Sequence, residues 1–95
     1  MNTLSLRNIR EFVKQHPDSY LSLTAWYKMA KKARWRSIAA VRQVYPHADL
    51  VGNYTVFNIR GNHYRLIAEI NYQYQQILIR EILTHEEYDR DKWKS

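Results

Sequence analysis

Two side chains near the end of the chain can transfer protons at neutral pH. His85 and Tyr88 lie three positions apart in the stretch THEEYD and share one flank of a predicted short helix. Histidine titrates near neutrality, and tyrosine can orient a group or donate a proton. This pair is therefore a candidate acid–base site.

Arginine residues on neighbouring predicted strands could supply the positive charge that such a site needs. Arg80 lies on the strand that precedes His85, Arg65 lies on the adjacent predicted strand, and Arg60 and Asn62 lie in the turn before it. RNA cleavage without a metal requires deprotonation of the 2′-hydroxyl, stabilisation of the phosphate charge and protonation of the leaving oxygen. Arginine suits the second task because it binds phosphate oxygens in a bidentate way. The plainer alternative for each arginine is a solvated strand or turn position.

The same stretch also resembles a zinc signature, since His85 and Asp89 share one face of a helix. A zinc site needs a third protein ligand, and the usual partner at the fourth following position is a second histidine. The other histidines show no recognisable spacing; they are His16, His47 and His63. We therefore expect neither a metal nor another cofactor.

A structural role for this stretch is a capping box. Thr84 can accept a hydrogen bond from the backbone N–H of Glu87 while the Glu87 side chain reaches back to Thr84. The early acids Glu86 and Glu87 also suit the positive end of a helix. The pattern predicts a helix that begins here, and it leaves His85 and Tyr88 for chemistry.

Positive charge is concentrated in the first half of the chain. Residues 1–50 carry nine lysine and arginine residues against three acidic ones, whereas residues 51–95 carry six of each. A one-sided positive field favours a polyanionic partner, either nucleic acid or an acidic protein, although a solvated helix face is the plain alternative. The residues that we expect to bind RNA in this region are Lys28, Lys31, Lys32, Arg34 and Arg36.

The composition excludes several classes of protein. The 95 residues suit one domain, 1–95, and contain no cysteine, which removes disulfides and thiolate metal sites. No apolar run is long enough to span a membrane, and the N-terminus lacks the apolar stretch of a secretory signal. We therefore expect a cytoplasmic protein without a membrane partner.

The hydrophobic pattern changes from helical to alternating along the chain, which predicts an α+β fold. We expect N-terminal helices on one face of an antiparallel β-meander, followed by a short C-terminal helix. Ser5, Asp18 or Ser19, and Ser37 are the predicted caps of the three N-terminal helices. The second helix is predicted to end near Arg34, and its predicted buried stripe is Leu23, Trp26, Tyr27, Ala30 and Ala33. The predicted strands cover 50–51, 55–59, 63–71 and 76–83. In the strand 63–71, alternation places Tyr64, Leu66, Ala68 and Ile70 on one face and Arg65, Ile67 and Glu69 on the other.

Two blocks of sequence resemble the signature of the HigB family of bacterial type II toxins. They are VFNIRGNHYRLIAEI, residues 56–70, and IREILTHEEYD, residues 79–89. The segment HPDSYLSLTAWYKMAKKARWRS, residues 16–37, is also similar, so that the resemblance covers nearly the whole chain. The positions that match the family motif are Arg60, Asn62, Tyr64, Arg65, Arg80, His85 and Tyr88.

This resemblance implies a RelE-like fold and an mRNA interferase that cuts translated mRNA at the ribosome without a metal ion. It also implies a cognate antitoxin, commonly of the helix-turn-helix type. Under this hypothesis His85 is the general base or acid with Tyr88 as its partner, and Arg65 and Arg80 stabilise the phosphate. The alternatives are a non-enzymatic poison that binds DNA gyrase, as in other members of the superfamily, and a chain that kept the fold but lost toxicity.

Overall fold

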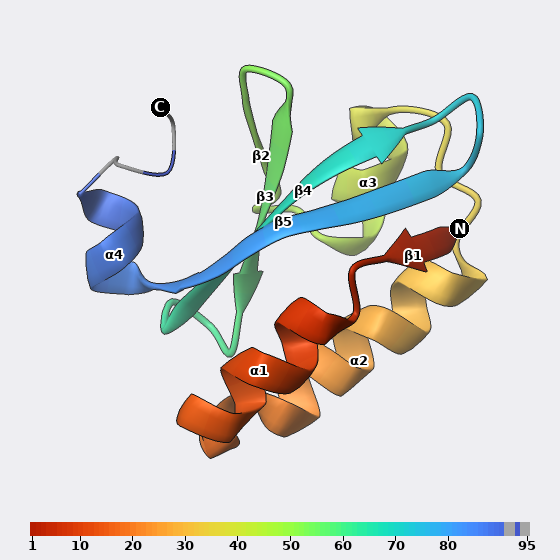
Figure 1. The fold of residues 1–95 in the computed structure, drawn as a ribbon. Coiled ribbons are helices and arrows are strands. Elements are labelled where there is room, and N and C mark those ends of the chain that lie inside the picture. Colours follow the sequence, from red (N-terminus) through yellow and green to blue (C-terminus); the bar gives the residue numbers. More distant parts are fainter. Residues whose placement is uncertain (91–92, 94–95) are drawn as a thin grey trace.

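The computed structural model describes residues 1–90 and 93, and Figure 1 shows the arrangement of its elements. The helices are α1 (Arg7–Gln15), a 3-10 turn η1 (Pro17–Ser19), α2 (Tyr20–Lys32), α3 (Ile38–Val44) and α4 (His85–Asp89). The strands are β1 (Asn2–Leu4), β2 (Asp49–Val51), β3 (Tyr54–Ile59), β4 (Tyr64–Asn71) and β5 (Gln76–Thr84).

The strands form one five-stranded sheet in the order β1-β5-β4-β3-β2. Strands β2 to β5 form an antiparallel meander, which confirms the predicted α+β class. The sequence patterns did not predict β1, which pairs with β5 in parallel and places Thr3 opposite Ile77. A strand of three residues is too short to show alternation, so only its partner strand reveals it.

Alternation along β4 separates the two faces of the sheet. Leu66 and Ala68 pack into the core beneath the helices, whereas Arg65 and Ile67 point to the opposite side, which we call the open face. Strands β4 and β5 pair with Tyr64 opposite Thr84 and Arg65 opposite Leu83. The register shifts once, between Ile67 and Ala68. The predicted division of β4 between its two faces is confirmed.

Helix α2 contributes most of the helical side of the core. Three members of the predicted stripe, Leu23, Trp26 and Ala30, are buried, whereas Tyr27 and Ala33 are only partly buried. The Trp26 ring packs edge-on against Phe57 with 5.4 Å between centroids. The helix ends at Lys32, two residues before the predicted end, because Ala33 is extended. Within residues 1–90 and 93, no helix has the length and hydrophobicity needed to cross a membrane.

Two of the predicted caps are confirmed and two are wrong. Ser37 and Thr84 accept hydrogen bonds from the backbone of α3 and α4, and Thr84 forms the complete capping box with Glu87. Helix α1 begins at Arg7 without a side-chain cap, and Ser5 has a positive φ of 67°. Helix α2 likewise has no side-chain cap.

The side chains predicted to cap α2 are used elsewhere. The Ser19 hydroxyl donates to the carbonyl oxygen of His16 at 2.6 Å, and the Asp18 carboxylate accepts from the Tyr64 hydroxyl at 2.8 Å. Tyr64 lies 46 residues further along the chain, so local sequence patterns contain no sign of this contact.

The capping box gives a first prediction on stability. Thr84→Ala removes the acceptor for the Glu87 N–H and should lower the free energy of unfolding by about 1 kcal/mol, the usual cost of losing an N-cap. Thr84→Ser keeps the acceptor and should stay close to the wild type. Urea unfolding followed by circular dichroism measures both variants, and an unchanged Thr84→Ala midpoint would contradict the assigned role.

Candidate functional site

Helix α4 and the β3–β4 turn meet at one end of the β4–β5 hairpin (Figure 1). The last residue pair between β4 and β5 is Tyr64 with Thr84. The backbone N–H of His85 donates to the carbonyl oxygen of His63 at 3.0 Å, which adds one more backbone hydrogen bond beyond this pair. The capping box then turns the chain into α4 directly beside this turn. The hairpin thus brings the two blocks of the sequence motif together.

Arg65 and Tyr88 form a side-chain contact between these two blocks. The Arg65 guanidinium carbon lies 5.5 Å from the centre of the Tyr88 ring, within the range of a cation–π interaction. One terminal nitrogen of Arg65 also donates to the carbonyl oxygens of Asn62 at 3.2 Å and Tyr64 at 3.1 Å. These contacts hold the guanidinium on the open face.

His85 is paired with Asp89, which the sequence suggested as a metal ligand or as an acid that suits the start of the helix. Its Nδ1 lies 2.9 Å from Oδ2 of Asp89, and about half of each side chain is exposed. A carboxylate at this distance favours the tautomer with the proton on Nδ1, in which Nε2 carries the free lone pair. The spacing of four residues on a helix was visible in the sequence and could have indicated this pairing.

Arg60 and Asn62 lie in the same turn, but Arg60 points toward the helices. Its guanidinium pairs with Asp18 at 3.3 Å, and its backbone has a positive φ of 51°. Asp18 also accepts from the buried Tyr64 hydroxyl, and this hydrogen bond, together with Arg60, lowers the pKa of the Asp18 carboxyl group. Burial and the same hydrogen bond raise the pKa of Tyr64. The network fastens the turn to the start of α2.

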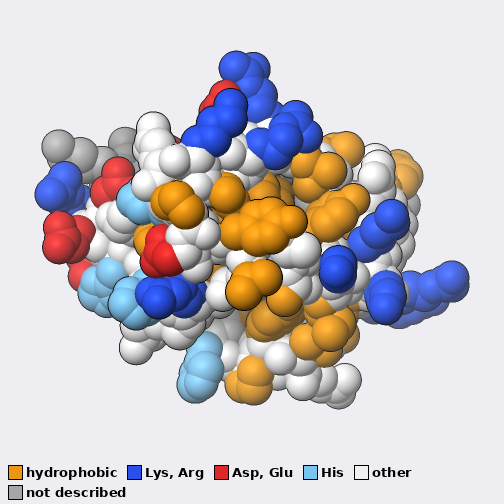
Figure 2. Space-filling model, turned by 90° about the horizontal axis from the view of Figure 1, so that it is seen from below, with side chains coloured by type: hydrophobic (Ala, Val, Ile, Leu, Met, Phe, Trp, Pro, Cys, Tyr) orange, Lys and Arg blue, Asp and Glu red, His pale blue; other side chains and the backbone are white. Residues whose placement is uncertain are grey.

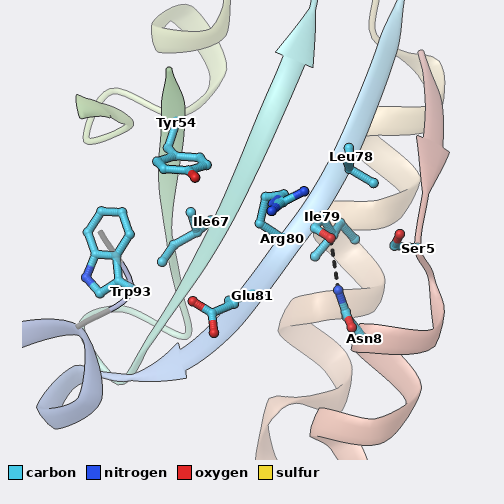
Figure 3. A pocket seen from close by; sticks show the side chains of 9 residues that line it. All are labelled: Ser5, Asn8, Tyr54, Ile67, Leu78, Ile79, Arg80, Glu81 and Trp93. Carbon is cyan, nitrogen blue, oxygen red and sulfur yellow. Dashed lines mark hydrogen bonds between the residues drawn. The ribbon is translucent and has the colours of Figure 1, made fainter. Parts of the chain in front are cut away.

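Arg80 lies apart from this group. It precedes Leu83, the residue opposite Arg65, by three positions, which corresponds to about 10 Å along a strand. Its side chain lines a hollow of about 510 Å³ on the open face together with Tyr54, Glu81 and Trp93 (Figure 3). Its Nε lies 3.9 Å from Glu69, a long and half-exposed ion pair.

The basic residues of α2 and the following segment lie at the other end of the molecule. Four of them surround a second hollow beside the β4–β5 turn; they are Lys31, Lys32, Arg34 and Arg36. Strand β4, about 23 Å long at eight residues, separates this turn from the end that carries α4. Figure 2 accordingly shows histidine side chains toward the left of the lower face and lysine and arginine side chains projecting at the right.

Trp93 was not identified from the sequence as a site residue. Its indole ring stacks on Tyr88 with 5.1 Å between centroids and 17° between planes, and its N–H donates to the Tyr88 carbonyl oxygen at 3.0 Å. Tyr88 therefore lies between a guanidinium and an indole ring. Among residues 1–90 and 93, no three histidine or acidic side chains are placed to hold a metal ion together.

Comparison with known proteins assigns the family. Residues 19–91 match the family model of HigB toxins, described as the RelE-like toxic component of a toxin-antitoxin system. The chain belongs to the HigB toxin family. Membership in a family of toxin components implies that the protein has a cognate antitoxin.

Curated relatives agree with this assignment over nearly the whole chain. The mRNA interferase toxin HigB of Escherichia coli K12 is 26% identical over 92 residues, which cover 94% of this chain and 88% of the relative. The mRNA interferase HigB of Shigella flexneri gives the same figures. The mRNA interferase HigB of Escherichia coli O6:H1 is 26% identical over 93 residues, 95% of this chain and 90% of the relative.

The Asp18 network gives a prediction on pH dependence. The pKa of Asp18 in the folded protein lies below the ordinary value of 3.8. The ionised carboxylate therefore contributes its full stability above pH 3.8, and this contribution is lost as the pH falls further. Asp18→Asn should therefore lose less stability than the wild type between about pH 5 and about pH 3.

Urea unfolding at the two pH values measures this difference. The control Asp49→Asn changes an exposed carboxyl group on β2 and should keep the wild-type pH dependence. An acid response of Asp18→Asn identical to that of the wild type would show that the network does not contribute.

Proposed function

We propose that this HigB-family chain is an endoribonuclease toxin that cuts mRNA on the ribosome without a metal ion. The observation that supports the proposal is the contact of Arg65 with Tyr88 at the end of the sheet where α4 begins with His85. The relatives that match nearly the whole chain are named mRNA interferases, which supports the same activity here. The proposed substrate also implies that the chain acts in the cytoplasm.

The proposed reaction is a transesterification within the RNA. The 2′-oxygen gives its proton to a general base and bonds to the adjacent phosphorus, the P–O5′ bond breaks, and a general acid protonates the leaving 5′-oxygen. His85 serves as the base or the acid, and Tyr88 is its partner. Asp89 holds Nδ1 of His85 and stabilises the imidazolium whenever His85 carries the second proton.

Arg65 is the group proposed to stabilise the charge on the reacting phosphate. A guanidinium has five N–H donors, and the two backbone carbonyls beside Arg65 both accept from one terminal nitrogen. The remaining donors can bind phosphate oxygens. Arg80, about 10 Å away along the strands, fits the phosphate of a neighbouring nucleotide instead.

The turn and the basic end of the molecule are proposed to position RNA. Asn62 lies in the turn beside α4 and is proposed to contact the backbone of the substrate strand. Arg60 is paired with Asp18 on the helix side, so binding of RNA by Arg60 requires that its guanidinium leave this ion pair. Lys31, Lys32, Arg34 and Arg36 lie too far from His85 to touch the same nucleotide, and Lys28 lies one helical turn before Lys32 on α2. We therefore propose that they bind ribosomal RNA, with an acidic antitoxin surface as the competing partner.

Substitutions at the convergent residues test the cleavage hypothesis. His85→Gln should lower mRNA cleavage in a translating extract about 100-fold or more, the usual contribution of a positioned acid or base. Arg65→Ala should cause a loss of similar size because the phosphate charge is no longer stabilised. Mapping of mRNA ends by primer extension measures both effects.

The matched control is His47→Gln, which changes an exposed histidine between α3 and β2 and should cleave like the wild type. Circular dichroism shows whether each variant is folded. Full activity in folded His85→Gln and Arg65→Ala would overturn the site. Intact mRNA together with inhibited DNA supercoiling would support the gyrase-binding alternative.

Salt dependence tests the basic end separately. The variant Lys31→Ala with Arg34→Ala should bind ribosomes more weakly, and the slope of log affinity against log salt should fall by about 2, because two phosphates are no longer neutralised. The control Arg10→Ala with Lys14→Ala removes the same charge from α1 and should keep the slope. If the first variant keeps its slope but escapes neutralisation by antitoxin, this surface binds the antitoxin instead.

A further inference from the structure

The hollow on the open face has a wall of two aromatic rings. Tyr54 and Trp93 are both half-buried, and their ring centroids lie 6.0 Å apart at an angle of 65° (Figure 3). The other two tryptophans, Trp26 and Trp35, are 1% and 5% exposed in the core. Trp93 is thus the one tryptophan whose ring lines the surface. Aromatic rings in this setting stack with unpaired RNA bases.

Trp93 connects this wall to the proposed reaction site. One face of its indole packs on Tyr88, and the ring also borders the hollow. A base held in the hollow would therefore lie next to the nucleotide that reaches Tyr88 and Arg65. Ile67, which is 1% exposed, forms the apolar floor between the hollow and the contact of Arg65 with Tyr88.

The hollow is lined by one positive and one negative side chain, Arg80 and Glu81, and a bound phosphate would account only for the positive one. Arg80 lines the hollow, and among residues 1–90 and 93 its side chain is paired only with Glu69, at 3.9 Å. Because this contact is long, the guanidinium can turn to a phosphate. Glu81 lies opposite Ile67 on the neighbouring strand and is exposed. Within the described part of the chain its carboxylate forms no ion pair. A carboxylate on a face that binds RNA repels phosphates unless it accepts hydrogen bonds from a base.

Guanine is the base that satisfies a carboxylate best. Its Watson–Crick edge presents two neighbouring donors, N1–H and the N2 amino group, which match the two carboxylate oxygens. Adenine and cytosine each offer one amino group beside a ring nitrogen that repels the second oxygen, and uracil offers no amino group.

We propose that this hollow is a guanine-binding site that selects the position of cleavage. The base stacks on the wall of Tyr54 and Trp93, its Watson–Crick edge donates to Glu81, and the adjoining phosphate binds Arg80. The inference rests on the proposed function in that the RNA which it binds is the RNA that is cut. Glu81 is then a specificity residue rather than a catalytic one.

Binding of uncleavable RNA tests the site without requiring catalysis. The probes are 2′-O-methyl hexamers of uridine, either uniform or with one central guanosine or adenosine. The guanosine hexamer should bind about tenfold more tightly than the uniform one and quench tryptophan emission. Trp93→Phe should keep most of this affinity, because phenylalanine also stacks, but should lose the quenching. Equal affinity for the three hexamers would overturn the proposal.

Substitution of the carboxylate gives the second readout. Glu81→Gln can pair with adenine as well as guanine, so the preference for guanosine over adenosine should disappear, and mapped cleavage sites in a translating extract should lose their guanine enrichment. The control Glu86→Gln changes an exposed carboxylate in α4 outside the hollow and should leave both results unchanged.

The two readouts separate this inference from the proposed function. If the wild type prefers the guanosine hexamer but cuts no mRNA, the cleavage proposal fails and the base site stands. If the wild type cuts mRNA and Glu81→Gln leaves the base composition of the cut sites unchanged, the base site is wrong and the cleavage proposal stands.

Discussion

The pairing of β4 with β5 is the constraint on which the rest of the structure depends. Because side chains alternate between the faces of a strand, a slip of one residue would move every core side chain of β4 to the open face. The register that buries Leu66 and Ala68 is the same register that directs Arg65 outward. The same register of β4 and β5 therefore determines both the burial of the core and the exposure of Arg65.

The same hairpin separates two kinds of chemistry. Its α4 end carries His85, Tyr88 and Arg65, where the oriented imidazole and the ring contacts favour one fixed geometry. Its other end lies beside the lysine and arginine residues in the last turn of α2 and just after it, which favour an extended polyanion rather than one bound group. About 23 Å of strand lies between them, more than two Debye lengths at physiological salt, so the two ends act as electrically separate sites.

The sequence predicted the features that depend on neighbouring residues. The Thr84–Glu87 capping box, the faces of β4 and the burial of three of the five predicted residues of the α2 stripe follow from local spacing and are confirmed. Contacts between distant segments were missed, because they depend on how complete elements pack. Asp18 binds Tyr64 instead of capping α2, and the three residues of β1 form a strand because they pair with β5. The distance of Arg80 from Arg65 likewise depends on the register and not on either residue.

The chemical ends of cleaved RNA test the central claim most directly. Attack by the 2′-oxygen leaves a 2′,3′-cyclic phosphate on one fragment and a 5′-hydroxyl on the other, whereas attack by a metal-activated water commonly leaves a 5′-phosphate. Purified protein can be added to translating ribosomes, and the new 5′ ends can then be tested for labelling by polynucleotide kinase without prior phosphatase. The site at Arg65, His85 and Tyr88 predicts ends that are labelled directly. Ends that need phosphatase treatment first would contradict it.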